Sequence, residues 1–307
     1  MGRHRDGRLK LGKIDYLNVW PLYYAMEHGH TPNPFHIAAR TPSELNAMVC
    51  RGELDLSAVS SVTYARYPDL FKIIPGLAIA CDGPVHSVLL LSRKPLEFLD
   101  GEDILLTRHS DTSVVLLKIL VEKFWGLLNV RYHRGALSHA LSNGSSPTAF
   151  LAIGDEALVW SRHAPYPYRY DLAEVWHGWT GLPFVFALWV VRRDVAARAP
   201  ELVLEAARCL WESKSWGLQH LDLLCREGAR SGFLDPVALR CYYDTFIFDL
   251  HEKALQGLQL FYGLMADMGD IRACPSLDFW TPDDSKGIGV DRAQGGEGDD
   301  KGWAARL

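Results

Sequence analysis

Residues 104–125 read ILLTRHSDTSVVLLKILVEKFW, and this stretch decides the fold because it joins a strand to a helix through a polar segment. Its two ends are apolar and predict a short strand before the segment and a helix after it. Between them lie Ser110, Asp111, Thr112 and Ser113. Hydroxyls beside the unpaired N–H groups of a helix start form a site for an anion. No glycine-rich phosphate loop is present, so a carboxylate fits better than a nucleotide. Ordinary helix capping by Ser110 is the alternative.

The composition argues against a nucleic-acid partner. The chain has 307 residues, of which 48% are hydrophobic and 22% are charged, and its formal net charge is −5. This length allows two compact domains or one large one. The chain has no basic surplus to neutralise phosphates, so we expect no nucleic-acid partner. A small anionic ligand remains compatible, because it needs only local hydrogen-bond donors.

The cysteines indicate reduced thiols in a cytoplasmic protein. They lie at positions 50, 81, 209, 225, 241 and 274, and none forms a Cys-x-x-Cys pair. Asp15 and Asn18 interrupt the apolar stretch after the basic N-terminus, which makes a poor signal peptide. No window approaches the roughly 20 apolar residues of a membrane span. We therefore expect no membrane partner, no metal and no cofactor. The oligomeric state stays open, with a homodimer as one candidate.

Strand-like and helix-like segments alternate through the first part of the chain, which predicts an α/β fold with two lobes. The first lobe is expected to comprise residues 9–91 and 193–280, and the second residues 92–192. The chain then crosses between the lobes twice, near Ser92–Pro95 and near Pro183–Leu188. Paired crossings form a hinge, and a ligand belongs in the cleft between the lobes.

The C-terminal part has a different pattern. Residues 200–227 and 236–268 have the periodicity of two long amphipathic helices. An aromatic cluster in the second of these, residues 242–248, fits a helix core better than a cofactor site. The tail, residues 281–307, carries many Gly and Asp residues and few apolar ones, so we expect it to be disordered.

Small polar residues recur where strands are expected to end. In open α/β sheets, ligands bind beyond the carboxyl ends of the strands, so these side chains are expected to converge on one site. Capping of the following helix is the alternative explanation for each of them, and both roles can coexist. The residues are Asn18, Ser60, Ser61, Ser110, Thr112, Ser113 and Asp155.

The sequence lacks the standard catalytic motifs. It contains no Gly-x-Ser-x-Gly elbow and no phosphate loop. His251 and Glu252 are adjacent, but Leu255 stands where a zinc protease requires its second histidine. An uncharged polar site without a metal or a nucleophile fits two kinds of protein. One is a solute-binding protein, and the other is an eliminase or isomerase that mainly orients a reactive substrate.

Six segments, in this order along the chain, resemble one enzyme family. They are GKIDYLN (12–18), LDLSAVSS (54–61), GPVHSVLLLS (83–92), LTRHSDTS (106–113), IGDEAL (153–158) and TGLPFVFA (180–187). Each segment alone is unspecific. The ordered set resembles chorismate dehydratase, the first enzyme of the futalosine route to menaquinone.

The resemblance implies a two-lobed fold like that of the type II periplasmic binding proteins. It also implies a hydro-lyase, a carbon–oxygen lyase that removes water from chorismate to give 3-[(1-carboxyvinyl)oxy]benzoate. The family's functional Asn matches Asn18 and its functional Ser matches Ser87. The run 110–113 falls where the family would hold a substrate carboxylate, and Ser60, Ser61 and Asp155 are further substrate-binding candidates.

Two alternatives stay open beside the dehydratase. One is a non-catalytic solute-binding protein for a small carboxylate, and the other is the sister 1,4-dihydroxy-6-naphthoate synthase, which shares the fold. For the dehydratase, neither Asn18 nor Ser87 is a strong base at neutral pH. Our hypothesis is therefore that the enolpyruvyl carboxylate of the substrate takes the proton while the protein orients it.

Overall fold

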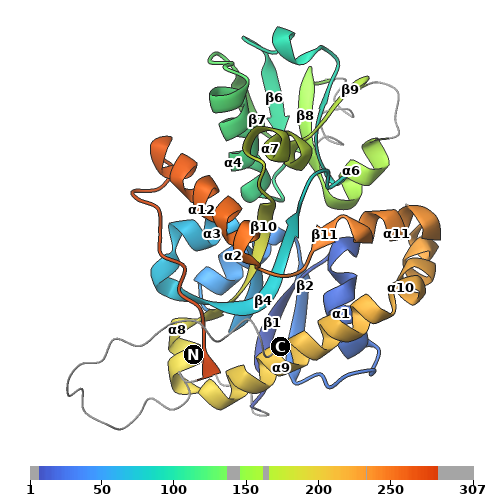
Figure 1. Ribbon diagram of the computed structural model, residues 1–307, viewed down its shortest axis with the longest axis vertical. Coiled ribbons are helices and arrows are strands. Elements are labelled where there is room, and N and C mark those ends of the chain that lie inside the picture. The colour runs from blue at the N-terminus through green and yellow to red at the C-terminus, as the bar shows by residue number, and fades with distance from the viewer. Residues whose placement is uncertain (1–6, 137–145, 162–165, 233, 283–307) are drawn as a thin grey trace.

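The computed structural model describes residues 7–136, 146–161, 166–232 and 234–282. These residues form two β-sheets, of six and five strands, in two lobes that are stacked along the long axis (Figure 1). All but two residues of the tail that we expected to be disordered lie outside the described residues. No helix of the described part is long and apolar enough to cross a membrane.

The sheet of the first lobe has the strand order β11-β4-β10-β3-β1-β2. Strands β1, β2 and β3 are parallel, and β10 pairs antiparallel with both β3 and β4. Every residue of β3 is buried, as expected for an apolar strand in the middle of a sheet. The strands are β1 (Leu9–Ile14), β2 (Phe35–Arg40), β3 (Leu56–Ser60), β4 (Phe71–Cys81), β10 (Phe184–Arg192) and β11 (Phe246–Ile247).

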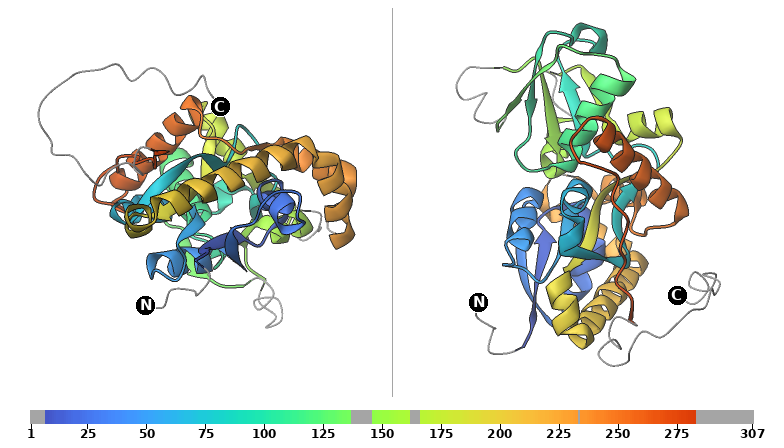
Figure 2. Two further views of the ribbon diagram at one scale, coloured as in Figure 1. Left: turned by 90° about the horizontal axis from the view of Figure 1, so that it is seen from below. Right: turned by 90° about the vertical axis from the view of Figure 1, so that its left-hand side faces the viewer.

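Helices cover both faces of this sheet (Figures 1 and 2). Helix α9 lies against α1, and a Cβ atom at Gly217 would lie 2.0 Å from the carbonyl oxygen of Pro21, so this crossing requires glycine. Helix α12 packs against α4 of the second lobe as well as β10. The helices are α1 (Trp20–Glu27), α2 (Pro42–Cys50), α3 (Ser61–Arg66), α8 (Arg193–Arg198), α9 (Pro200–Gln219), α10 (Leu221–Gly228), α11 (Pro236–Asp244) and α12 (Glu252–Asp267).

The sheet of the second lobe has the order β7-β6-β8-β5-β9. Strand β6 is parallel to β7 and β8, whereas β5 is antiparallel to β8 and β9. The strands are β5 (Val88–Ser92), β6 (Asp103–Leu106), β7 (Arg131–Arg134), β8 (Ala149–Ile153) and β9 (Tyr168–Asp171). The helices are α4 (Thr112–Ile119), which continues as a π-helical turn (Leu120–Phe124), α6 (Gly154–Trp160) and α7 (Leu172–Thr180).

Strand pairing moves both expected lobe limits by one strand. Strand β5 belongs to the second sheet and β10 to the first, so the chain crosses at residues 82–87 and 181–183. The crossing expected near Ser92–Pro95 is therefore wrong, and the one expected near Pro183–Leu188 is close to the observed position. Both strands are almost entirely buried apolar runs, and such runs specify a strand without specifying its partner.

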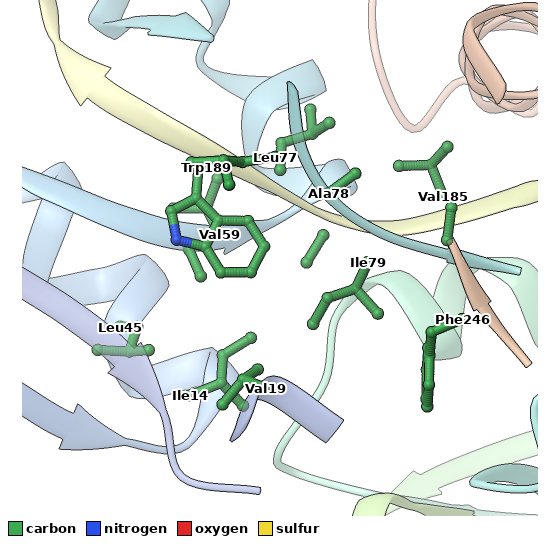
Figure 3. Close-up of a cluster of buried hydrophobic side chains, with 14 of the residues drawn as sticks. Ile14, Val19, Leu45, Val59, Leu77, Ala78, Ile79, Val185, Trp189 and Phe246 are labelled. Atoms are coloured by element: carbon green, nitrogen blue, oxygen red, sulfur yellow. The ribbon is translucent and has the colours of Figure 1, made fainter. Parts of the chain in front are cut away.

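The long helix expected over residues 236–268 is also wrong, because a strand interrupts it. Phe246 and Ile247 form β11 and pair with Cys81 and Ala80 at the edge of the first sheet. A strand of two residues is too short to show a period of its own. Figure 3 shows Phe246 beside Ile79 in the apolar cluster that also contains Trp189, so β11 adds to the apolar core at this edge of the sheet.

Candidate active site

A pocket lies between the two sheets, where the connections after β1, β3, β4, β6 and β8 meet. This is the edge at which ligands bind in open α/β sheets. The apolar side chains that line it are Ile14, Pro42, Ile79, Val85, Val88, Ile153, Phe186, Ala187 and Phe246. The other lining residues are Tyr16, Asn18, Ser60, Ser87, Ser110, Thr112, Ser113 and Gly154.

The pocket brings together all but two of the site residues expected from the sequence. The exceptions, Ser61 and Asp155, are not among its lining residues. The Ser61 hydroxyl is fully buried and donates to the carbonyl oxygen of Val185 at 2.8 Å, which ties α3 to β10. Ser61 therefore supports the pocket wall, whereas its neighbour Ser60 lines the pocket.

Ser60 and Ser110 both cap helices while they line the pocket. The Ser60 hydroxyl accepts from the N–H of Thr63 at 3.2 Å, and the Ser110 hydroxyl accepts from the N–H of Ser113 at 3.1 Å. Ser110 also donates to the hydroxyl of Ser113 at 3.0 Å. Capping is thus correct for both residues, and it fixes the hydroxyls at the pocket surface.

Thr112 connects the two lobes. Its hydroxyl oxygen accepts from the backbone N–H of Val62 at 3.3 Å and lies 3.3 Å from the hydroxyl oxygen of Ser61. Val62 and Ser61 belong to α3 of the first lobe, whereas Thr112 begins α4 of the second. Thr112 also lines the pocket, so a ligand bound there would contact the residue that joins the lobes.

A second contact between the lobes runs through Asn46 on α2. The Asn46 amide donates to Ser60 Oγ at 3.1 Å and to Asp111 Oδ2 at 3.3 Å, while its carbonyl oxygen accepts from the Ser60 N–H at 3.0 Å. Arg134 donates to the other oxygen of Asp111 at 3.2 Å. Asn46 therefore fixes Ser60 and also bonds to the second lobe.

Ser87 lies at the end of the first crossing and is buried. Its carbonyl oxygen accepts from the Gly154 N–H at 2.8 Å. The phenol of Tyr242 on α11 lies beside the Ser87 side chain. Burial raises the pKa of Tyr242 well above its ordinary value, and the contact with Ser87 opposes that shift. Ser87 thus contacts one neutral phenol and the start of α6.

Asn18 has unused hydrogen-bonding capacity at the pocket. Its Oδ1 atom is buried and has no hydrogen-bond partner among the described residues. Buried polar atoms are normally paired, so an unpaired one in a pocket lining marks a place where a ligand can bind. The residue lies in a short 3-10 helix (Leu17–Val19) that follows β1.

Asp155 lies next to this 3-10 helix. Burial raises the pKa of its carboxyl to about 6, and the nearby Leu17 N–H opposes the shift. The Oδ1 atom of this carboxyl has no hydrogen-bond partner among the described residues. The preceding residue, Gly154, has a φ of 56°, and a Cβ atom there would lie 3.1 Å from the ring of Tyr16. The start of α6 therefore packs closely on the segment that carries Asn18.

The lining of the pocket is almost without ionisable groups. Of its described residues, Tyr16 alone titrates, and burial together with the nearby Asp155 and Glu156 raises its pKa well above the ordinary value. No group of three or more His, Cys, Asp or Glu side chains in the described part could hold a metal ion. Neutral hydrogen-bond donors are thus what this pocket offers to a ligand.

Comparison with known proteins assigns the family. A family model described as menaquinone biosynthesis matches residues 9–267. The chain belongs to this family. Two proteins to which the chain is similar carry the name chorismate dehydratase. The protein from Thermus thermophilus is 32% identical over 266 residues, which cover 82% of this chain and 93% of the relative. That from Campylobacter jejuni is 29% identical over 182 residues, or 57% and 64% of the two chains.

Solved structures confirm the expected fold for this menaquinone-biosynthesis family member. A protein from Archaeoglobus fulgidus is 20% identical, with a TM-score of 0.70 over 88% of this chain and all of the other. The periplasmic aliphatic sulphonate binding protein SsuA from Escherichia coli is 11% identical, with a TM-score of 0.64 over 95% and 98% of the two chains. The two-lobed, periplasmic-binding-protein-like fold expected from the sequence is thus confirmed.

Sequence reasoning missed three residues that build the site. Asn46 lies inside a helix, where no local pattern marks it, and only its contact with Ser60 reveals its role. Phe246 was assigned to a helix core, although its strand brings it to the pocket. Tyr16 lies within the segment 12–18 that carries the resemblance, so the sequence could have identified it as a site residue.

Proposed function

We propose that this protein is a chorismate dehydratase, a hydro-lyase that converts chorismate into 3-[(1-carboxyvinyl)oxy]benzoate. The observation that carries the proposal is a pocket between the two lobes that is lined by Asn18 and Ser87 together with Ser110, Thr112 and Ser113. Identity of 32% to a chorismate dehydratase over most of both chains supports the choice of substrate.

The reaction needs orientation more than covalent help. Loss of the C3 proton and the C4 hydroxyl makes the ring aromatic, which supplies the driving force. The protein must hold two carboxylates and stabilise the departing hydroxide. Asn18 and Ser87 can donate hydrogen bonds to that oxygen, and the hydroxyls of Ser110, Thr112 and Ser113 can hold a carboxylate.

The proton acceptor in this mechanism is the substrate itself. At neutral pH the phenol of Tyr16 is protonated, and the other described lining residues are not bases. The enolpyruvyl carboxylate of chorismate takes the C3 proton, the C–H electron pair forms the new ring double bond, and the C4–O bond breaks. The proton then passes to the departing hydroxide, so that water leaves.

We place this reaction in the cytoplasm. All six cysteines are free thiols, which is typical of proteins in a reducing compartment. Cys81, Cys209 and Cys225 are buried, so their thiols contribute to packing.

The test is a turnover assay with purified protein and chorismate. We expect an aromatic absorption spectrum and a product lighter than chorismate by one water in mass spectrometry. Asn18→Ala should lower kcat by about 100-fold, the usual cost of one donor to a developing oxyanion. Ser213→Ala, which removes a buried, unpartnered hydroxyl in α9, should leave kcat unchanged.

Two other outcomes would reject the proposal. Tight binding of chorismate without any product would identify a solute-binding protein. Neither binding nor turnover of chorismate would favour the sister naphthoate-forming enzyme.

A further inference from the structure

We propose that Asp171 is a positioning residue for Ser87, because its carboxylate holds the two residues before Ser87 in a strained left-handed turn. The catalytic readout of this inference rests on the proposed function, whereas its geometry rests only on contacts among described residues. Asp171 is far from Ser87 in sequence, ends β9 in the second lobe and does not line the pocket.

The two carboxylate oxygens of Asp171 have different partners. Oδ2 accepts from the backbone N–H groups of Val85 at 3.0 Å and His86 at 2.6 Å. Oδ1 accepts from the N–H groups of Ala173 at 3.0 Å and Glu174 at 3.2 Å. One oxygen therefore caps helix α7, and the other fastens the crossing segment that leads to Ser87.

The fastened segment has an unusual backbone. His86 has a φ of 62°, and it is the one residue other than glycine with a positive φ in the described part of the chain. In this conformation the Cβ atom of a residue with a side chain lies too close to the following carbonyl oxygen. Such strain persists only where surrounding contacts enforce it, and it concentrates at functional sites. The histidine side chain is exposed, so the enforcing contacts are those of the backbone.

Asp171 is suited to this task because it is buried and charged. Its exposed fraction is 8%. Burial raises the pKa of the carboxyl, and the four N–H bonds oppose that shift. Charge-assisted bonds of this kind are stronger than bonds between neutral groups. A contact of this strength can hold the two amides against the strain at His86.

The turn decides where the Ser87 hydroxyl lies. Ser87 directly follows the strained residue, and its own carbonyl oxygen is held by the Gly154 N–H at 2.8 Å. Its position is therefore fixed by Asp171 before it and by Gly154 at its carbonyl. A relaxed His86 would rotate the peptide that enters Ser87 and displace its hydroxyl from the pocket. Displacement by about 1 Å can lower turnover by about 100-fold.

The test separates helix capping from the fastening of the turn. In Asp171→Ser, the serine still caps α7, but the acceptor for Val85 and His86 is lost. The matched control is Asp235→Ser at the start of α11, where the carboxylate accepts from the Ala238 N–H at 2.8 Å. We expect Asp171→Ser to lower kcat with chorismate by about 10–100-fold while KM changes by less than about 3-fold. Asp235→Ser should keep both constants within about 2-fold of the wild type.

A second measurement does not depend on the substrate. Amide hydrogen exchange of a peptide covering residues 82–90 should accelerate by about 10-fold or more in Asp171→Ser and stay unchanged in Asp235→Ser. Should Asp171→Ser not fold, Asp171→Thr, which also offers a capping hydroxyl but no second acceptor, replaces it with the same expectations.

The outcomes distinguish the inference from the proposed function. Lower kcat together with faster exchange supports the role of Asp171. Unchanged kcat overturns it, and so does a loss of kcat without faster exchange, because the turn would then hold without Asp171. If the wild type does not convert chorismate, the proposed function fails. The exchange measurement alone then decides, since faster exchange supports the fastening and unchanged exchange overturns it.

Discussion

The helix starts on the two sides of the pocket share their first contact and differ in the residues that follow. Ser60 in the first lobe and Ser110 in the second each accept from the N–H three residues later. After Ser60, the hydroxyl of Ser61 donates to Val185 of its own lobe at 2.8 Å, and it also lies 3.3 Å from the Thr112 hydroxyl of the second lobe. After Ser110, by contrast, Asp111 and Thr112 both bond to the first lobe.

This difference teaches that capping alone does not define the role of a polar helix start. The cap is a local contact that both lobes need for stability. The one or two residues after the cap determine which side chains of the helix start contact the opposite lobe. In the second lobe, Thr112 bonds to the first lobe and also lines the pocket, so the proposed carboxylate site and the contact between the lobes share this residue.

Matched valine substitutions on the two sides of the pocket should have unequal effects on KM. Thr112→Val removes the hydroxyl of a pocket residue and leaves the Val62 N–H without its acceptor. A buried N–H without an acceptor lowers the free energy of unfolding by about 1–3 kcal/mol. We expect KM for chorismate to rise by about 10–100-fold. Thr63→Val removes a hydroxyl that pairs with Ser60, and KM should stay within about 3-fold. Equal effects on KM would contradict the asymmetry.

Asp155 lies at another helix start of the second lobe, that of α6, and extends the comparison to it. Its carboxyl pKa is raised to about 6, so the folded protein binds a proton more tightly than the unfolded chain does. Stability should therefore fall as pH rises from about 4 to about 6, and Asp155→Asn should abolish this fall. Above about pH 7 the variant should be more stable by about 2 kcal/mol.

Chemical denaturation of both proteins across this pH range measures the effect. A stability difference that does not change with pH would show that the carboxyl titrates normally. Asp249→Asn, at an exposed carboxylate paired with Lys214, is the control that should not show this pH profile.

The smallest expected effect concerns the contact between Asn46 and Asp111. In a double-mutant cycle with alanine at both positions, the coupling free energy for chorismate binding should be about 1 kcal/mol. The pair is partly exposed, which limits its size. Asn46→Ala alone should cost more, because it also frees the Ser60 N–H. A coupling free energy of zero would show that the bond between Asn46 and Asp111 does not contribute to chorismate binding.

The sequence predicts those parts of the site that depend on contacts between residues close together in the chain. Ser60, Ser110 and Ser113 were identified because hydroxyls at helix starts follow a fixed spacing, and the structure places all three at the pocket. The carboxyl ends of the strands were expected to converge, and most of the predicted side chains do so. Asn18 was expected from its place at a strand end, and the ordered resemblance supplied its functional role. Ser87 came from the resemblance alone, because a single serine gives no signal of its own.

Contacts between residues that lie far apart in the sequence could not be predicted. The buried apolar runs of β5 and β10 fit either sheet, so sequence placed both in the wrong lobe. Asn46 and Asp171 act on residues 14 and more than 80 positions away, and no periodicity encodes such contacts. The two-residue strand β11 is too short to interrupt the helical pattern around it.

In the proposed mechanism, two serines of one pocket have different roles: Ser87 acts on the departing hydroxyl, and Ser110 holds a carboxylate. Steady-state kinetics of Ser87→Ala beside Ser110→Ala test it most directly, because both remove a buried hydroxyl at the pocket. We predict that Ser87→Ala lowers kcat by about 100-fold with little change in KM, and that Ser110→Ala raises KM by about 10-fold with little change in kcat. The reverse pattern, or equal losses in both constants, would contradict the account.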